Sequence, residues 1–330
     1  MDYLKSTAMA AVALALATPA VAEWAPKRPI EFVVASGAGG GTDNFARTIQ
    51  SALTRNKIVD VSMVVLNKGG GSGAEAFLYA RQNEGDPNKL IFGTNNVYLL
   101  PHVAKLAYKA SDLQPVAALA MDEFLVWVKA DAPYKTVMDL VEAAKAEPGK
   151  LPFGGSQSKD TDETLVALIE QTTGADFKYV PFNGGGEVAV QLAGGHVVAN
   201  VNNPNENLGQ WQAGAVRPIC VFAPERMAKS EPIHDGMGWQ DIPTCKEQGL
   251  DIDSYRMPRT VWLPAGTEPE VVAYYADALS KVTETQEWKD YLAKTSQTPA
   301  LLSGEDLQKF IAQNEASTVK VFEAEGWAKH

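Results

Sequence analysis

The chain has 330 residues, of which 45% are hydrophobic and 21% are charged, and its formal net charge is −11. This length exceeds one ordinary domain and suits two lobes of roughly 150 residues each. The excess of acidic residues argues against nonspecific nucleic-acid binding, so no nucleic-acid partner is expected. A small anionic ligand remains compatible with this charge if backbone amides and an arginine outweigh the repulsive field locally.

The amino terminus has the features of a secretory signal peptide. An apolar run over residues 8–20 follows Lys5, and residues 20–22 read Ala-Val-Ala, the small-residue pattern of a cleavage site. The run is too short to span a bilayer. We therefore expect residues 1–22 to be removed after Ala22 and the mature protein to be periplasmic. A buried N-terminal helix is the alternative.

Strand patterns then alternate with glycine-rich or polar turns and helical patterns. The predicted strands cover residues 30–34, 61–66 and 89–93. The turns that follow them cover residues 36–43, 68–73 and 94–96, and helices are predicted over 44–55 and 74–82. Thr42 or Asp43 is expected to cap the first of these helices. This repeated order of strand, turn and helix predicts a parallel α/β sheet.

A second lobe is expected to begin near Val128 and to repeat the same alternation. Its predicted strands cover residues 152–154, 177–180, 197–201 and 218–222, and its predicted helices cover 136–146, 161–173 and 187–193. A further strand at 261–263 and long helices over 270–285, 286–294 and 305–325 are assigned to the first lobe.

The resulting prediction is a two-lobed α/β protein, each lobe a mostly parallel sheet flanked by helices. Lobe 1 comprises residues 23–127 plus 255–330, and lobe 2 comprises 128–254. Strands that cross between the lobes would form a hinge, with the ligand held in the cleft beside it.

Two cysteines, Cys220 and Cys245, are present in the whole chain. Export implies an oxidising compartment, which favours a disulfide between them; two buried free thiols are the alternative. Two cysteines without histidines at ligand spacing do not make a zinc site, so no metal is expected.

The glycine turns are the main chemical signal, because glycine allows a ligand to approach the main chain and a helix start presents free N–H groups to an anion. Three such turns, at 36–43, 69–73 and 183–186, favour anion binding. A dinucleotide is the rival ligand, since residues 69–74 fit G-x-G-x-x-A. The acidic residue expected about twenty positions later is missing, so no cofactor is expected.

An enzyme is the alternative class of function, namely a hydrolase acting on a small carboxylate ester. Residues 154–158 approach the serine-hydrolase pattern G-x-S-x-G but lack its final glycine. None of the four histidines has a nucleophile or metal partner at a recognisable spacing. We therefore expect a binding protein without catalytic residues.

Arg259 stands where the chain should cross back to the first lobe, and Pro258 fixes the backbone beside it. A guanidinium at this place could hold a ligand carboxylate through two hydrogen bonds. A surface or interlobe ion pair is the alternative.

The sequence resembles the substrate-binding proteins of tripartite tricarboxylate transporters, the Bug-type receptors. The segments that carry the resemblance are PIEFVV at 29–34, GGGTD at 39–43, YVPFNGGG at 179–186, QLAGG at 191–195, DIPT at 241–244 and LPAGT at 263–267. The resemblance implies a Venus-flytrap fold, an extracytoplasmic location and a small carboxylate ligand. It also implies a transporter partner with one large and one small membrane subunit. We expect the receptor itself to be a monomer.

The resemblance also implies that the ligand is bound by loops of both lobes. The expected contacts, with Arg259 added from its position, are Ser36, Gly39, Gly40, Gly41, Thr42, Asp43, Thr94, Asn95, Ser156, Ser158, Asn183, Gly184, Gly185, Asn202, Asn203 and Arg259. Many relatives carry an aspartate where this chain has Asn202, and another at Val198. The missing carboxylate at Asn202 makes the cleft less suited to an ammonium group, which favours a plain di- or tricarboxylate.

Overall fold

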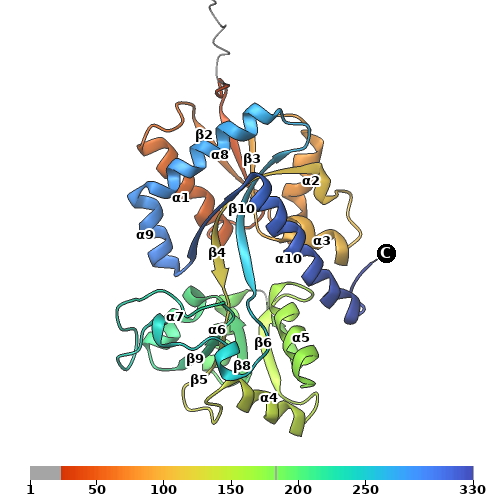
Figure 1. The fold of residues 1–330 in the computed structure, drawn as a ribbon, viewed down its shortest axis with the longest axis vertical. Helices are drawn as coiled ribbons and strands as arrows, with labels where there is room; N and C mark the ends of the chain where they lie inside the picture. Colours follow the sequence, from red (N-terminus) through yellow and green to blue (C-terminus); the bar gives the residue numbers. More distant parts are fainter. Residues whose placement is uncertain (1–23, 183, 330) are drawn as a thin grey trace, which may run out of the picture.

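The computed structural model describes residues 24–182 and 184–329, and these form two lobes built on separate sheets (Figure 1). Within these residues the larger sheet has six strands in the order β11-β4-β10-β3-β1-β2 and the smaller has five in the order β7-β6-β8-β5-β9. The predicted signal peptide and Asn183 lie outside the described residues. The two-lobed α/β prediction is confirmed.

The larger lobe contains three parallel strands at one side of its sheet, β1 (Ile30–Val34), β2 (Met63–Asn67) and β3 (Lys89–Gly93). Each is followed by a helix: α1 (Gly41–Arg55), α2 (Ala74–Gln82) and α3 (Asn96–Val103). Every residue of β3 is buried, as expected for a strand covered by helices on both faces.

The smaller lobe repeats this arrangement with the parallel strands β6 (Pro152–Ser156), β7 (Lys178–Phe182) and β8 (Ala199–Asn202). Its helices are α4 (Val137–Ala146), α5 (Thr161–Thr173), α6 (Gly185–Ala193) and α7 (Pro204–Gln212). Two further strands, β5 (Leu125–Lys129) and β9 (Val216–Val221), pair antiparallel at the other side. The predicted disulfide is confirmed, since Cys220 in β9 is bonded to Cys245.

Two long strands connect the lobes, β4 (Leu113–Glu123) and β10 (Arg256–Pro264), and they run between them in Figure 1. They pair antiparallel from Arg256 opposite Glu123 to Pro264 opposite Leu113. Both sheets are therefore mixed rather than mostly parallel. Only Phe124 separates β4 from β5, so the smaller sheet begins at Leu125, before the Val128 boundary expected from the sequence.

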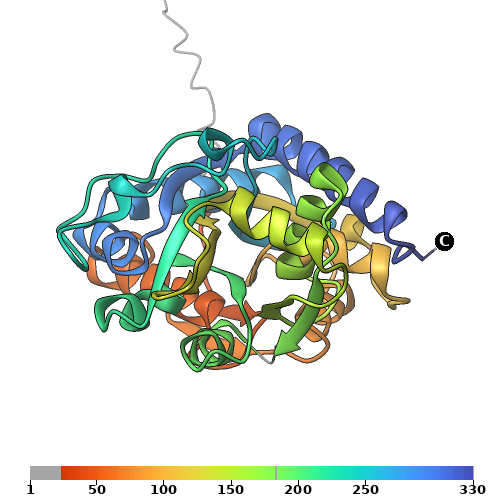
Figure 2. The same cartoon turned by 90° about the horizontal axis from the view of Figure 1, so that it is seen from below.

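The chain returns to the larger sheet after β10. It forms α8 (Pro269–Glu284), α9 (Gln286–Thr295), β11 (Thr298–Ser303) and α10 (Gly304–Ala324). The end of α10 lies beside α5 (Figures 1 and 2), where Gln171 Nε2 donates a hydrogen bond to Glu325 Oε1 at 2.7 Å. None of the helices in the described part of the chain is long and apolar enough to span a membrane.

Several element boundaries differ from the sequence prediction in a way that affects the site. α1 begins at Gly41 rather than Asn44, and α6 begins at Gly185 rather than Glu187. Neither helix has a side-chain hydrogen bond at its N-cap. Glycines that look like loop residues in the sequence therefore form the first helical turn, and their backbone amides belong to the helix start.

Candidate functional site

The predicted glycine and polar turns all follow the carboxyl ends of parallel strands, three in each lobe. The two sets of turns meet across the lobes. Ser72 Oγ, in the turn after β2, donates to Gln157 Oε1, in the turn after β6, at 3.1 Å. Asn203, after β8, donates its Nδ2 to the carbonyl of Glu123, the last residue of the connecting strand β4, at 2.9 Å. The helix starts of both lobes thus lie near a shared interface.

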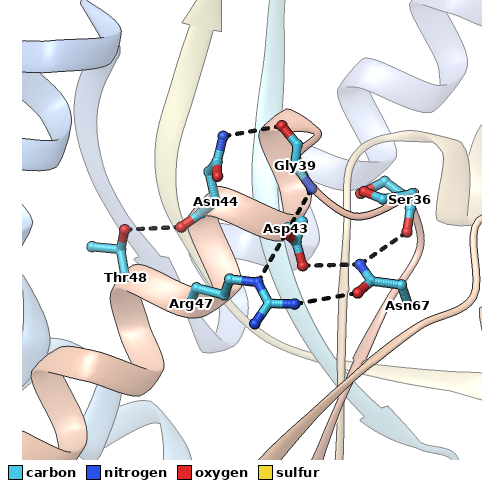
Figure 3. Close-up of polar contacts among 8 residues, drawn as sticks. Ser36, Gly39, Asp43, Asn44, Arg47, Thr48 and Asn67 are labelled. Carbon is cyan, nitrogen blue, oxygen red and sulfur yellow. Dashed lines mark hydrogen bonds and ion pairs between the residues drawn. The ribbon is translucent and has the colours of Figure 1, made fainter.

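The turn before α1 is organised by the buried carboxylate of Asp43 (Figure 3). Its Oδ2 accepts hydrogen bonds from Gly39 N at 2.8 Å and Arg47 Nε at 2.9 Å, and its Oδ1 accepts one from Asn67 Nδ2 at 2.9 Å. Asn67 Nδ2 also donates to Ser36 O at 3.2 Å.

These bonds determine the charge state of Asp43. Burial alone would raise the pKa of the Asp43 carboxyl, but the bonds from Arg47, Gly39 and Asn67 outweigh it and hold this pKa below its ordinary value. The carboxylate is engaged in shaping the turn before α1, within which Gly40 N donates to Gly37 O at 3.2 Å.

Arg259 lies directly on the start of α1. A Cβ built on Gly41 would be 2.7 Å from Arg259 Nη2, so a glycine is needed for this approach. Arg259 is 8% exposed; its guanidinium Nη1 donates to Thr42 Oγ1 at 2.9 Å, and its Nη2 is 2.5 Å from Asp122 Oδ2. The sequence left a ligand carboxylate and an ion pair open as partners of Arg259, without naming Asp122. The ion pair with Asp122 is therefore an addition to the predicted site.

Asn95 is the N-cap of α3 and is fully buried. Neither of its side-chain amide atoms has a hydrogen-bond partner within the described part of the chain. Thr94, just before it, accepts the backbone N–H of Asn96 at 3.4 Å through its Oγ1. A buried amide without partners is costly unless something satisfies it, which makes Asn95 a candidate for a bound ligand.

In the smaller lobe, Ser156 is bonded to a carboxylate that the sequence did not single out. Its backbone N–H and its Oγ both donate to Asp162 Oδ2, at 2.7 and 2.8 Å. Burial raises the pKa of Asp162 to about 8, although the two bonds from Ser156 oppose this shift. Ser158 lies in the same turn and is exposed.

The start of α6 is held by Asn202. This side chain is 1% exposed, and its Nδ2 donates to Gly185 O at 2.9 Å and to Asn207 Oδ1 at 2.6 Å. Its Oδ1 has no partner among the described residues. Asn202 thus presents a neutral acceptor atom at the start of α6.

Glu206, on α7, covers the first glycine of α6. A Cβ built on Gly185 would lie 2.2 Å from Glu206 Cδ, and Glu206 Oε2 accepts the backbone N–H of Asn203 at 3.2 Å. Burial, with the Asp122 carboxylate adding to it, raises the pKa of Glu206 to about 7, while Arg259 opposes the rise. Asp122, Arg259 and Glu206 therefore form one electrostatic group.

Comparison with known proteins identifies the type of molecule. The chain matches the tripartite tricarboxylate transporter family receptor, TctC, over residues 45–326. It belongs to this receptor family. It is 24% identical to protein BugT of Bordetella pertussis, over 90% of this chain and 89% of that one.

Solved structures agree with this assignment. A TctC solute-binding protein from Polaromonas is 28% identical with a TM-score of 0.75, covering 91% of this chain and 99% of that one. Rpa4515 of R. palustris, solved with adipate, is 26% identical with a TM-score of 0.75, covering 91% and 98%. The receptor is accordingly a solute-binding protein and not an enzyme.

The hydrolase alternative also lacks a geometric basis in the receptor. Ser156, the serine of the partial G-x-S-x-G pattern, is bonded to Asp162. His102 is 2.7 Å from Glu315 on α10, and His234 is 3.4 Å from Asp235. No serine–histidine pair is seen among the described residues.

Three acidic residues of the receptor's interface were missed by the sequence analysis: Asp122, Asp162 and Glu206. A signal for Glu206 was present, because Asn203 and Glu206 have the spacing of a capping box and form one at the start of α7. Asp122 lies in a strand that was not predicted, and its partner Arg259 is distant in sequence. Nothing local marked Asp162.

A groove of about 790 Å³ also lies between the lobes of the receptor but is separate from the predicted contacts. Its lining includes Glu123 and Arg256 of the connecting strands and the segment 225–231, and it contains none of the predicted ligand contacts.

Proposed function

We propose that this receptor captures a small organic di- or tricarboxylate between its lobes and delivers it to a tripartite tricarboxylate-type membrane transporter. The observation that supports this most strongly is the meeting of helix starts from both lobes at one interface. Free N–H groups and the positive end of the helix dipole favour an anion at such a place. Two ends of one ligand, each carrying a carboxylate, would suit two facing sets of helix starts.

The proposed contacts are the residues predicted from the sequence in the six turns, together with Arg259. Among them, Asn95 and Arg259 have the strongest support. Asn95 is buried with both amide atoms unpartnered, and Arg259 Nε is buried without a hydrogen-bond partner among the described residues. Adipate, a dicarboxylate, accompanies the related Rpa4515. Asn202, with no charge of its own, supports a ligand without an essential amine.

We further propose that the receptor is periplasmic, that its signal peptide is cleaved after Ala22, and that it acts as a monomer. Its transporter would consist of a large and a small membrane subunit. The boundary between lobe 1 and lobe 2 would be crossed by β4 and β10, which would act as the hinge for closure around the ligand.

A thermal-shift screen followed by calorimetry tests the function. Adipate, malate, citrate and aspartate are compared, because a ligand that binds only the folded state raises the melting temperature. The proposal expects a di- or tricarboxylate to raise it and to be recovered unchanged after incubation. Tight binding of aspartate with the plain carboxylates ignored would contradict it, and so would conversion of the ligand to product.

A further inference from the structure

The carboxylate of Glu206 occupies a place where a helix start would otherwise receive an external anion. Both of its oxygens would lie within 2.3 Å of a Cβ built on Gly185, the first residue of α6. Among the described residues, its carboxylate accepts one hydrogen bond, from the backbone N–H of Asn203. The turn at Gly184 and Gly185 therefore already has an acidic group from its own lobe.

The groups that face Glu206 are mostly acidic or acceptors. Asp122 on β4 and Asp162 on α5 both interact unfavourably with its charge, and Arg259 on β10 is the cation that opposes them. Arg259 is itself ion-paired with Asp122 at 2.5 Å. Tyr291 on α9 interacts with this same Arg259–Asp122 pair. The unpartnered Oδ1 of Asn202, which is 1% exposed, adds a further acceptor beside Gly185.

We propose that Glu206 is a specificity-determining residue of the smaller lobe: protonated, it admits a ligand carboxylate at the start of α6, and ionised, it excludes one. The inference rests on the proposed carboxylate-binding function. Two carboxylates that share a confined site cannot both be ionised without a large cost, so one of them takes up a proton. As a protonated acid, Glu206 also supplies an O–H donor to the incoming carboxylate.

The proton comes from solvent and is bound by the Glu206 carboxylate when the ligand enters, so ligand binding and proton uptake are coupled. With the Glu206 pKa raised to about 7 in the free protein, the competent protonated form is depleted as the pH rises above that value. The affinity for a fully ionised dicarboxylate should therefore fall about tenfold between about pH 6 and about pH 8.

Calorimetry with adipate, or with the dicarboxylate of the screen that raises the melting temperature most, tests this. The wild-type receptor is measured at both pH values and, at the higher one, in buffers of different ionisation enthalpy, which reports protons taken up. Glu206→Gln should bind with nearly the same affinity at both pH values and without proton uptake.

Two further variants test whether the effect depends on the position of the Glu206 carboxylate or on any negative charge near the start of α6. Glu187→Gln removes an exposed carboxylate from the first turn of the same helix and should keep the wild-type pH slope. Gly185→Ala places a methyl where the Glu206 carboxylate lies and should flatten the slope as Glu206→Gln does.

An equal slope and equal proton uptake in wild type and Glu206→Gln would overturn the inference while leaving the proposed function intact. Failure of every dicarboxylate to bind at either pH would overturn the proposed function itself.

Discussion

The starts of α1 and α6 are built alike but are covered by opposite charges. Each helix begins with a glycine after a parallel strand, and a charged side chain lies on that glycine. At Gly41 the charged group is the guanidinium of Arg259, whereas at Gly185 it is the carboxylate of Glu206. The same backbone motif therefore gives two different helix starts. At α1 the positive charge of Arg259 strengthens anion binding, whereas at α6 anion binding depends on whether Glu206 is protonated.

The largest effect on stability and on ligand affinity is expected from removing the positive charge of Arg259. Arg259→Ala leaves the buried Asp122 carboxylate without its ion-pair partner, which should cost about 3 kcal/mol in the free energy of unfolding. Dicarboxylate affinity should fall roughly 30-fold or more, because a desolvated charged partner of the ligand is lost. Urea unfolding and calorimetry measure the two effects.

Arg256→Ala is the matched control for Arg259→Ala. Arg256 lies on the same strand and pairs with the buried carboxylate of Glu123 at 2.9 Å, and both residues line the groove that contains none of the predicted ligand contacts. This control should lose stability while changing ligand affinity little. A similar loss of affinity in both variants would mean that Arg259 acts only through the architecture of the hinge.

Alanine substitution of Gly41 and of Gly185 compares the packing at the starts of α1 and α6 directly. Gly41→Ala drives a methyl into a guanidinium that is buried and ion-paired, so it should cost about 2 kcal/mol of stability through overpacking. Gly185→Ala meets the end of the Glu206 side chain, which can rotate away, and should cost less than about 1 kcal/mol. Denaturation of both variants in urea measures the difference, and the reverse order would contradict the described packing.

Replacing Asp43 tests how much the buried carboxylate at the start of α1 contributes to stability. Asp43→Asn weakens the bonds to Arg47 and Gly39 and should cost about 1–2 kcal/mol at neutral pH, a modest value because Arg47 is half exposed.

The pH dependence of the Asp43 effect has a defined sign. Because the folded-state pKa of Asp43 is lowered, this stabilisation is present above the ordinary aspartate pKa and is lost as the pH falls through the folded value. Thermal melts of wild type and variant should converge in acid. A constant gap at all pH values would indicate a purely steric effect.

Replacing Glu206 is expected to change stability in the opposite direction, by raising it. Its pKa is raised to about 7, so the folded protein favours the protonated side chain and loses stability as the pH rises from the ordinary glutamate pKa toward 7. Glu206→Gln should be more stable than wild type by on the order of 1 kcal/mol at about pH 8 and equal to it at about pH 4. Melting curves across this range would contradict the assignment if the variant were less stable at the higher pH.

Local patterns in the sequence were sufficient for the alternation of strands, turns and helices in the two lobes and for the disulfide. They were insufficient for the charges at the site, because these depend on contacts between distant segments. Arg259 and Thr42 meet through folding alone, as do Glu206 and Gly185. Asp43 was predicted as a ligand contact, and in the structure its oxygens accept hydrogen bonds from Gly39, Arg47 and Asn67. The strand ending at Glu123 was missed because no turn residues separate it from β5.

The connecting strand β10 is irregular at two positions, one of them beside Arg259. Its pairing with β4 shifts register between Arg259 and Thr260, and again between Val261 and Trp262. Such bulges concentrate the bend and twist of a paired strand. Any rotation of one lobe against the other would then curve the ribbon beside Arg259 and shift its guanidinium relative to α1. Under the proposed function, the bending of β10 during lobe rotation would therefore also change how closely the positive charge of Arg259 lies to the bound carboxylate.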